Sequence, residues 1–259
     1  MKWIVCVLMS LCVICHEVSG QSTAEIREKI ARQIWKNECG GTVQGLVTWN
    51  KGENFPSLGI GHFIWYPRGV REKFEESFPA FIAFCKQKGI RPMPILQGAA
   101  PWKDRTAFQQ ADVKGGLPAQ IRQWLASKKL MQVQGEFIMR RSLAALERIK
   151  RESDSPNELA SKYYAVAATP NGTYALIDYV NFKGEGVNHD ERYQGKGWGL
   201  MQVLEEMKPV TRGPAAAVEF AEAAKRVLSR RVANSPKSRG EKRWLVGWHN
   251  RCDTYKKKL

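Results

Sequence analysis

Apolar residues recur at regular spacing in the mixed segment that follows the apolar N-terminus of the chain. Ile26, Ile30 and Ile34 stand four residues apart, and Glu38 continues the same row. This spacing predicts an amphipathic helix with a buried apolar face, and Gly40 is a typical helix terminator. Because Glu38 closes the apolar row, we expect its carboxylate at the helix end, at the edge of the buried face.

A β-hairpin is predicted directly after this helix. Residues 42–49 are rich in β-branched side chains, residues 50–52 read Asn-Lys-Gly, and residues 57–64 favour a return strand. Gly59 and Gly61 alternate with apolar residues in this return strand. Such glycines are typical of a strand that another backbone approaches closely.

Helical patterns dominate the rest of the chain. An aromatic stripe from Phe74 to Cys85, interrupted by Pro79, predicts a core-facing helix. The Pro- and Gly-rich residues 89–101 predict a connecting loop. Further helices are expected over residues 102–111, 118–130, 134–151, 157–168, 173–182, 198–207, 214–232 and 240–257. We therefore expect a mainly α chain with one small β-hairpin.

The N-terminus has the pattern of a secretory leader. A lysine precedes the apolar residues 3–14, and small or apolar residues follow at the expected cleavage point. Residues 1–20 are therefore expected to be a signal peptide, and residues 21–259 to be exported as a secreted or periplasmic protein. Lipidation of Cys12 or Cys15 is the alternative, although neither follows the small residue that such sites favour.

The charge of the chain indicates the class of partner. The formal net charge is +16, and from Lys225 onward twelve Lys and Arg residues face only Glu241 and Asp253. A surface of this kind favours polyanions. For an exported protein these are an anionic cell wall or membrane surface, whereas nucleic acid fits the charge but not the leader. A basic face that serves only solubility is the alternative.

Cysteine and histidine usage limits the covalent chemistry. Outside the leader only Cys39, Cys85 and Cys252 remain, so at most one internal disulfide can form and its pairing stays open. We interpret Cys39 as structural. The histidines are scattered and show no ligand spacing with the cysteines, so we expect no metal site and no cofactor.

The segment from Glu38 to Tyr66 carries the candidate chemistry. A carboxylic acid at a helix end that faces a polar β-segment is suited to protonating a glycosidic oxygen. The order helix, Glu, hairpin and then Ser-Leu-Gly-Ile-Gly-His at residues 57–62 resembles the catalytic segment of phage-type lysozymes, whose motif is Thr-x-Gly-x-Gly-His. Residues 174–186 resemble a later segment of these enzymes, and the Trp- and Arg-bearing end of the chain does so more loosely.

This resemblance implies a two-lobed lysozyme-like fold with a small β-hairpin beside the active-site cleft. It divides residues 21–259 into a hairpin region (about 39–66), a helical insertion (about 67–130) and a helical lobe (about 131–259). A helical insertion is implied because the stretch between His62 and Tyr174 is longer than the corresponding stretch of a minimal phage lysozyme.

The resemblance also suggests roles for three residues. Glu38 is the expected general acid. The family carries an Asp in the hairpin turn, where this chain has Asn50-Lys51, so Glu53 is the nearest carboxylate that can activate water; a solvated turn residue is the alternative. Ser57 replaces the family Thr and would orient that water. Without the Asp, a lytic transglycosylase route through Glu38 alone stays open.

Four further residues are candidates for substrate contact. The rings of Trp49, Tyr66 and Tyr193 are suited to stacking on sugars, with core packing as the alternative for each. Glu185 follows the glycine that ends a central helix and is interpreted as structural or substrate-contacting. His62 is interpreted as a structural residue that ties the strand to a neighbouring helix.

The predicted function is cleavage of β-1,4-linked amino-sugar polymers, foremost peptidoglycan, by a monomeric exported enzyme. A chitosanase-like activity is an alternative that the positive charge disfavours, because enzyme and substrate would repel. An alternative of another class is a non-catalytic wall-binding protein that kept the fold and lost the Asp.

Overall fold

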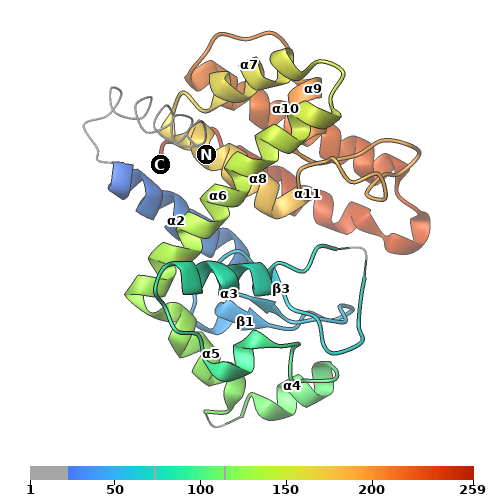
Figure 1. Ribbon diagram of the computed structural model, residues 1–259. Coiled ribbons are helices and arrows are strands. Elements are labelled where there is room, and N and C mark those ends of the chain that lie inside the picture. Colours follow the sequence, from blue (N-terminus) through green and yellow to red (C-terminus); the bar gives the residue numbers. More distant parts are fainter. Residues whose placement is uncertain (1–22, 73, 114) are drawn as a thin grey trace. The chain divides into compact units, whose positions relative to one another are not determined.

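The computed structural model describes residues 23–72, 74–113 and 115–259 (Figure 1). The expected leader lies outside these residues. The described residues form ten α-helices and one three-stranded antiparallel sheet. The prediction of a mainly helical chain with a small β-element is confirmed. None of the helices within the described ranges has the length and apolar character needed to cross a membrane.

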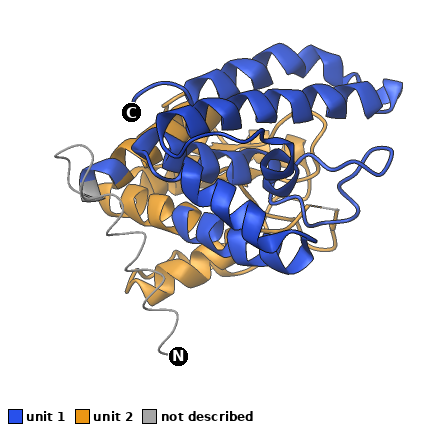
Figure 2. Ribbon diagram, turned by 90° about the horizontal axis from the view of Figure 1, so that it is seen from above, with its two compact units in different colours: residues 1–26, 139–259 blue, residues 27–138 orange. Residues whose placement is uncertain are grey.

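The chain divides into two compact units (Figure 2). Unit 2 comprises residues 27–138. Unit 1 comprises residues 139–259 together with the chain up to residue 26, so unit 2 is inserted in the sequence of unit 1.

Unit 2 contains the sheet and most of the first half of the chain. It includes nearly all of α2 and the first part of α6. Its elements in order are α2 (Thr23–Cys39), a 3-10 turn (Gln44–Leu46), β1 (Val47–Thr48), β2 (Ser57–Leu58), β3 (Phe63–Ile64), α3 (Phe78–Gln87), a second 3-10 turn (Pro94–Gln97), α4 (Arg105–Ala111), α5 (Leu117–Ala126) and α6 (Lys128–Glu152).

The sheet has one fully buried face. β2 lies in the centre and pairs with both neighbours, and its Leu58 stands opposite Val47 on one side and Phe63 on the other. All three side chains are 0% exposed. Residues that stand directly opposite each other in an antiparallel pair share a face. The other face therefore carries Thr48, Ser57 and Ile64.

The predicted return strand over residues 57–64 is not continuous. A tight turn over residues 59–62 splits it into β2 and β3, and the amide of His62 donates to the carbonyl of Gly59 at 3.1 Å. Gly59 has φ +75°, a conformation that glycine adopts without steric cost. The alternation of glycine with apolar residues therefore marks a turn rather than a strand.

The aromatic stripe begins later than predicted. α3 starts at Phe78, and Pro79 lies in its first turn, where proline is tolerated. Phe74 precedes the helix and is 37% exposed. The buried aromatic residues of α3 pack on the sheet, since the Phe81 ring centroid lies 5.0 Å from that of Phe63 in β3.

Helix limits near the middle of the chain also differ from the prediction. The expected helices over residues 118–130 and 134–151 are instead α5 and the longer α6, separated at Ser127. Ser127 has an extended backbone, and its amide donates to the carbonyl of Trp124. Residues 128–133 were predicted partly as the end of the first helix and partly as a gap, but they form the first turns of α6, where Leu130 and Val133 are buried.

Within the described residues, the regular elements of unit 1 are all helices. After the second half of α6 its elements are α7 (Pro156–Val166), α8 (Pro170–Lys183), α9 (Leu200–Glu206), α10 (Pro214–Asn234), 3-10 turns at Lys237–Arg239 and Glu241–Trp244, and α11 (Leu245–Thr254). α8 is central as predicted, because most of its side chains from Tyr174 to Val180 are buried.

A buried ion pair joins α8 to α11. Asp178 is 0% exposed and accepts hydrogen bonds from Arg251 at 2.8 Å and from the Tyr255 hydroxyl at 2.6 Å. Each partner of such a pair requires the other, because a buried charge left alone is strongly destabilising. The C-terminal helix is thereby fixed to the core of unit 1.

Candidate functional site

The predicted site residues lie in both units. Glu38, Glu53 and Ser57 belong to unit 2, as do Trp49 and Tyr66. The two remaining candidates, Glu185 and Tyr193, belong to unit 1.

Glu38 lies in the last turn of α2, as predicted. The row of isoleucines on the same face is buried, and the Glu38 side chain is 14% exposed. Gly40 and Gly41 follow with φ +61° and +69°, and the amide of Gly41 donates to Trp35, which ends the helix. The carboxylate is thus held at a helix terminus with limited access to solvent.

The turn after β2 brings His62 to this carboxylate. The Nδ1 atom of His62 lies 3.6 Å from Oε2 of Glu38. His62 has φ +47°, in the left-handed region that few residues other than glycine adopt. Its contact with Glu38 fits the prediction of a histidine that ties the β-segment to a helix.

Gln134 on α6 supports the turn from the other side. Its Oε1 accepts from the amide of Ile60 at 2.9 Å, and its Nε2 donates to the carbonyl of Leu125 at 2.9 Å. A side chain at Gly59 would overlap with Oε1 of Gln134. Gly59 therefore serves a turn pressed against a buried amide, a role that the sequence did not indicate for Gln134.

Cys39 follows Glu38 and is structural in character. Its thiol is buried and lies 3.5 Å from the carbonyl oxygen of Gly59. Burial, and secondly the charge of Glu38, raise the pKa of this thiol to about 12. A thiol with such a pKa stays protonated at neutral pH and is a poor nucleophile.

Two hydroxyl groups stand side by side on the outer face of the sheet. Ser57, 4% exposed, is directly opposite Thr48 in the register of β1 and β2. The Oγ1 atom of Thr48 is buried and has no hydrogen-bond partner among the described residues. Buried hydroxyls are usually satisfied, so a buried water molecule is the expected partner of this atom. Thr48 was not among the predicted site residues.

Glu53 lies in the connection that leads into β2. Its carboxylate accepts from Asn50 Nδ2 at 3.2 Å, and its backbone carbonyl accepts from the Trp49 indole at 2.8 Å. Burial raises the pKa of the Glu53 carboxyl above its ordinary value, the Asn50 hydrogen bond lowers it, and the charge of Glu72 raises it further. Glu53 is therefore a partly buried carboxyl group rather than a fully solvated turn residue.

The two aromatic candidates in unit 2 offer little ring surface. Trp49 is 5% exposed and packs on Phe108 with ring centroids 5.9 Å apart. Tyr66 is 6% exposed, and its hydroxyl donates to the carbonyl of Phe74 at 3.1 Å. These contacts are typical of core packing, the alternative given for both residues.

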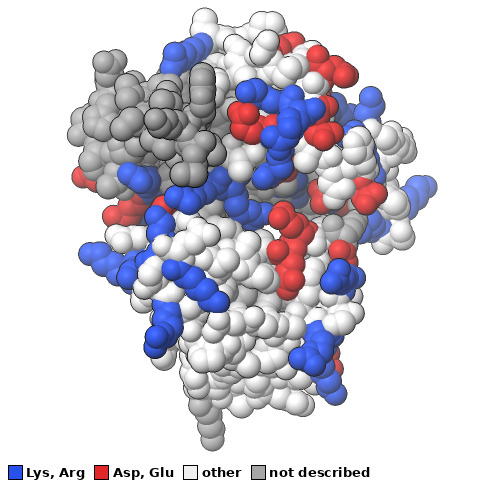
Figure 3. Space-filling view, viewed as in Figure 1, with Lys and Arg blue, Asp and Glu red and all other residues white. Residues whose placement is uncertain are grey.

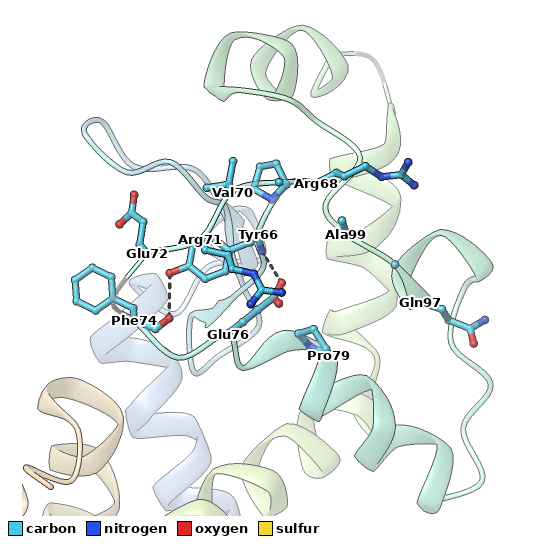
Figure 4. Close-up of a pocket in the computed structure, with 13 residues that line it drawn as sticks. Tyr66, Arg68, Val70, Arg71, Glu72, Phe74, Glu76, Pro79, Gln97 and Ala99 are labelled. Carbon is cyan, nitrogen blue, oxygen red and sulfur yellow. Dashed lines mark hydrogen bonds between the residues drawn. The ribbon is translucent and has the colours of Figure 1, made fainter. Parts of the chain in front are cut away.

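Tyr66 nevertheless borders a cavity of about 640 Å³ (Figure 4). The loop between β3 and α3 forms one wall, and Gln97 to Ala99 contribute to the other. Glu76 accepts from the amide of Tyr66 at 2.7 Å, and Glu72 accepts from Asn54 at 2.8 Å. Two arginines and two glutamates of this loop line the cavity, none of which the sequence pattern indicated: Arg68, Arg71, Glu72 and Glu76.

Glu185 in unit 1 is held by an arginine. Its carboxylate binds Arg148 of α6 through both Nε and Nη2, and its side chain is 14% exposed. Its backbone carbonyl accepts from the amide of Met201 at 2.8 Å, at the start of α9. Both contacts are structural, which is one of the two interpretations given for this residue.

Tyr193 has a comparable structural role. Its hydroxyl donates to Glu241 at 2.9 Å, and its ring packs on Trp198 with centroids 4.7 Å apart. Glu241 has a 0% exposed side chain and also binds Arg231 and Arg239. Burial alone would raise the pKa of Glu241, but the hydrogen bonds and charges of these partners hold it at about 2.

Many basic side chains of the C-terminal segment are engaged in ion pairs. Lys256 pairs with Glu222 and Asp253, and Arg226 and Arg230 pair with Glu206. On the face seen in Figure 3, acidic side chains lie next to Lys and Arg side chains in several places. The free positive charge of this segment is therefore smaller than the sequence count suggests.

The three cysteines of the described residues, Cys39, Cys85 and Cys252, are all buried free thiols.

No protein-family model, curated protein or solved structure matches the chain. The function is therefore inferred from the residues of the site.

Proposed function

We propose that the protein is an exported, lysozyme-like enzyme that cleaves β-1,4 glycosidic bonds of peptidoglycan, with Glu38 as the general acid. The observation that carries this proposal is the contact between Glu38 and His62. It joins a carboxyl group at a helix end to the final residue of the Ser-Leu-Gly-Ile-Gly-His segment. The proposed fold is the two-lobed lysozyme-like arrangement, with the sheet of unit 2 beside the cleft.

The proposed acid step needs a carboxyl group that is accessible but oriented. Glu38 meets this requirement in part, since its side chain is mostly buried yet not enclosed. The protonated carboxyl would give its proton to the glycosidic oxygen as the bond to the anomeric carbon breaks. His62 does not touch substrate in this scheme and acts as a positioning residue for Glu38.

The second step divides the proposal into two versions. In the hydrolytic version Glu53 removes a proton from water, while the Ser57 and Thr48 hydroxyls orient that water. The shared face of these two hydroxyls and the buried oxygen of Thr48 support this version. In the transglycosylase version a sugar hydroxyl attacks instead, and Glu38 alone exchanges the protons.

A non-catalytic wall-binding protein is the alternative function. It is supported by the hairpin turn itself, where Asn50-Lys51 replaces the Asp that the resemblance leads one to expect. Under this alternative the contact between Glu38 and His62 would be purely structural.

Digestion of purified sacculi separates these functions. Soluble fragments with reducing ends indicate hydrolysis, fragments with anhydro ends indicate transglycosylation, and pelleting without release indicates binding only. Glu38→Gln should lower the rate on the order of 10²-fold or more, since it removes a general acid while preserving shape.

A matched control lies on the same helix. Glu28 is exposed and pairs with Arg32, so Glu28→Gln should retain full activity. Near wild-type cleavage by Glu38→Gln would refute the assignment of the acid.

A further inference from the structure

The connection between α10 and α11 has an unusual surface. We call residues 235–246 the hairpin tip. α10 and α11 pack against each other, and the tip lies where the pair ends (Figures 1 and 2). The tip belongs to unit 1 and contains none of the residues assigned to the proposed glycan chemistry.

The exposed side chains of the tip are basic or apolar. Its four Lys and Arg residues, Lys237, Arg239, Lys242 and Arg243, are all exposed. Only Arg239 forms an ion pair, with Glu241, among the pairs that the described residues make. Three cations of the tip are thus free to meet an anionic partner.

The single acid of the tip is hidden. Glu241 is 1% exposed, and Arg231 and Arg239 neutralise it from two sides. It therefore fixes the conformation of the tip from the inside and adds no negative charge to its surface. Elsewhere in the C-terminal segment the paired acids are exposed, as at Glu222 and Asp253, whose side chains are 42% exposed, so the burial of its acid distinguishes the tip.

Apolar side chains stand among the cations. Val246 is 71% exposed, the highest value among the large exposed hydrophobic residues described, and Trp244 is 39% exposed. The guanidinium of Arg243 lies 4.5 Å from the centre of the Trp244 ring. Tryptophan is enriched at membrane–water interfaces, and arginine can keep its charge at the headgroups while its stem lies along apolar surface.

We propose that the hairpin tip docks on the surface of an anionic phospholipid bilayer. The cations would meet the lipid phosphates, while Trp244 and Val246 would enter the boundary between headgroups and acyl chains. A soluble polyanion explains the cations but not the exposed valine, because a hydrated polymer offers no apolar phase. This inference goes beyond glycan cleavage and does not depend on it.

Co-sedimentation with vesicles tests the proposal. The full chain is mixed with vesicles of equal parts phosphatidylglycerol and phosphatidylcholine, or of phosphatidylcholine alone, at about 0.1 M salt, where screening acts within about 10 Å. Residues 1–22 are common to all variants, so differences report the tip. Binding should be at least about tenfold tighter to the anionic vesicles.

Two sets of variants separate charge from insertion. Lys242→Gln with Arg243→Gln should weaken anionic-vesicle binding about 25-fold, at about fivefold per basic side chain. Val246→Asp should weaken it about tenfold. Val218→Asp and Lys208→Glu are the matched controls in unit 1, since both side chains are exposed and lie outside the tip, and both should bind like wild type.

Three results would overturn the proposal. These are equal binding to both kinds of vesicle, equal losses in the control variants, or wild-type binding by Val246→Asp combined with loss in the charge variant. The last pattern would indicate a soluble polyanion, and tighter binding of inorganic polyphosphate than of vesicles would indicate the same. Circular dichroism of each variant shows whether the fold is retained.

Discussion

Glu38 and His62 come from different elements of unit 2, yet Oε2 of the first lies 3.6 Å from Nδ1 of the second. The pairing of neighbouring strands or helices does not bring these two residues together. The contact requires a helix that ends at Cys39 and a turn that places His62 in a left-handed conformation. The proposed acid is therefore oriented by the backbone of the turn as much as by its own helix.

Substitutions of His62 test this orientation. His62→Asn should keep the fold, because Asn tolerates φ +47°, whereas His62→Ala should cost about 1 kcal/mol of stability. Both should lower kcat about tenfold with little change in KM, since the substrate itself is not contacted. Denaturant unfolding and steady-state kinetics measure the two effects, and an unchanged kcat in both variants would remove His62 from the mechanism.

Glu53 distinguishes the two versions of the chemistry. If Glu53 is the base, Glu53→Gln should abolish hydrolysis and Ser57→Ala should impair it. If the enzyme is a transglycosylase, Glu53→Gln should be mild and the products should carry anhydro ends. Mass analysis of the fragments gives the answer, and reducing-end products from an active Glu53→Gln protein would contradict both versions.

The hydrolytic version also predicts a pH dependence. Burial raises the pKa of Glu53 above its ordinary value of 4.5, and only the ionised form acts as a base. The rate should therefore begin to fall on acidification at a higher pH than a solvated Glu would give. The pH–rate profile of the wild-type protein measures this acidic limb, and a midpoint at or below pH 4.5 would contradict the assignment of Glu53 as the base.

Gln134 should be essential for the turn that carries His62. Gln134→Leu leaves the amide of Ile60 and the carbonyl of Leu125 without their partner, and should destabilise the protein by about 2–4 kcal/mol. Gln120→Leu, at an exposed position on α5, is the control and should change stability by less than about 0.5 kcal/mol. Urea unfolding monitored by circular dichroism compares them.

Glu241 should contribute to stability in a defined pH range. Its pKa in the folded state, about 2, lies below its ordinary value of 4.5, so its contribution is present above about pH 4.5 and is lost as the pH falls toward 2. Glu241→Gln should cost about 3–5 kcal/mol at pH 7 by leaving Arg231 without its buried partner. The difference in unfolding free energy between wild type and Glu241→Gln should narrow below pH 4.5. A difference that stays constant with pH would argue against this ion pair.

The C-terminal lysines are not equivalent. Lys256→Glu places a negative charge beside Glu222 and Asp253 and should lower the melting temperature. Lys257→Glu with Lys258→Glu should leave the melting temperature unchanged and weaken pelleting with sacculi at low salt. If the wild-type protein pelleted equally at low and high salt, electrostatic attraction would not be what binds it to the wall.

Periodicity predicted most of the helices because their buried faces are long and regular. The row from Ile26 to Ile34 and the buried side of α8 are examples. The break between two of the helices was predicted after residue 130 but lies at Ser127, since two helices that meet without a Gly or Pro leave no composition signal that fixes the boundary. The prediction of one continuous return strand was wrong because Gly59 and His62 take left-handed conformations. The alternation of glycine with apolar residues looks the same in the sequence whether the segment forms a turn or a strand.

The candidate site was predictable only where one segment carries it. Glu38, Glu53 and Ser57 lie within one short stretch, and a motif can relate them. Gln134 lies 74 positions beyond Ile60, with which it shares a hydrogen bond, and a lone Gln in a helix carries no such signal. Thr48 was overlooked because its role depends on strand register, which places it opposite Ser57.

The three buried thiols have a consequence for how the protein behaves under oxidising conditions. Each is protected only by packing, since burial raises the pKa of Cys39 and Cys252 to about 12 and that of Cys85 to about 11. Complete unfolding exposes all three and returns them to ordinary reactivity. Any disulfide then formed is foreign to the native state and leaves a third thiol to exchange with it. Under oxidising conditions, a single complete unfolding event can therefore become irreversible, and the lifetime of the protein is set by its unfolding rate.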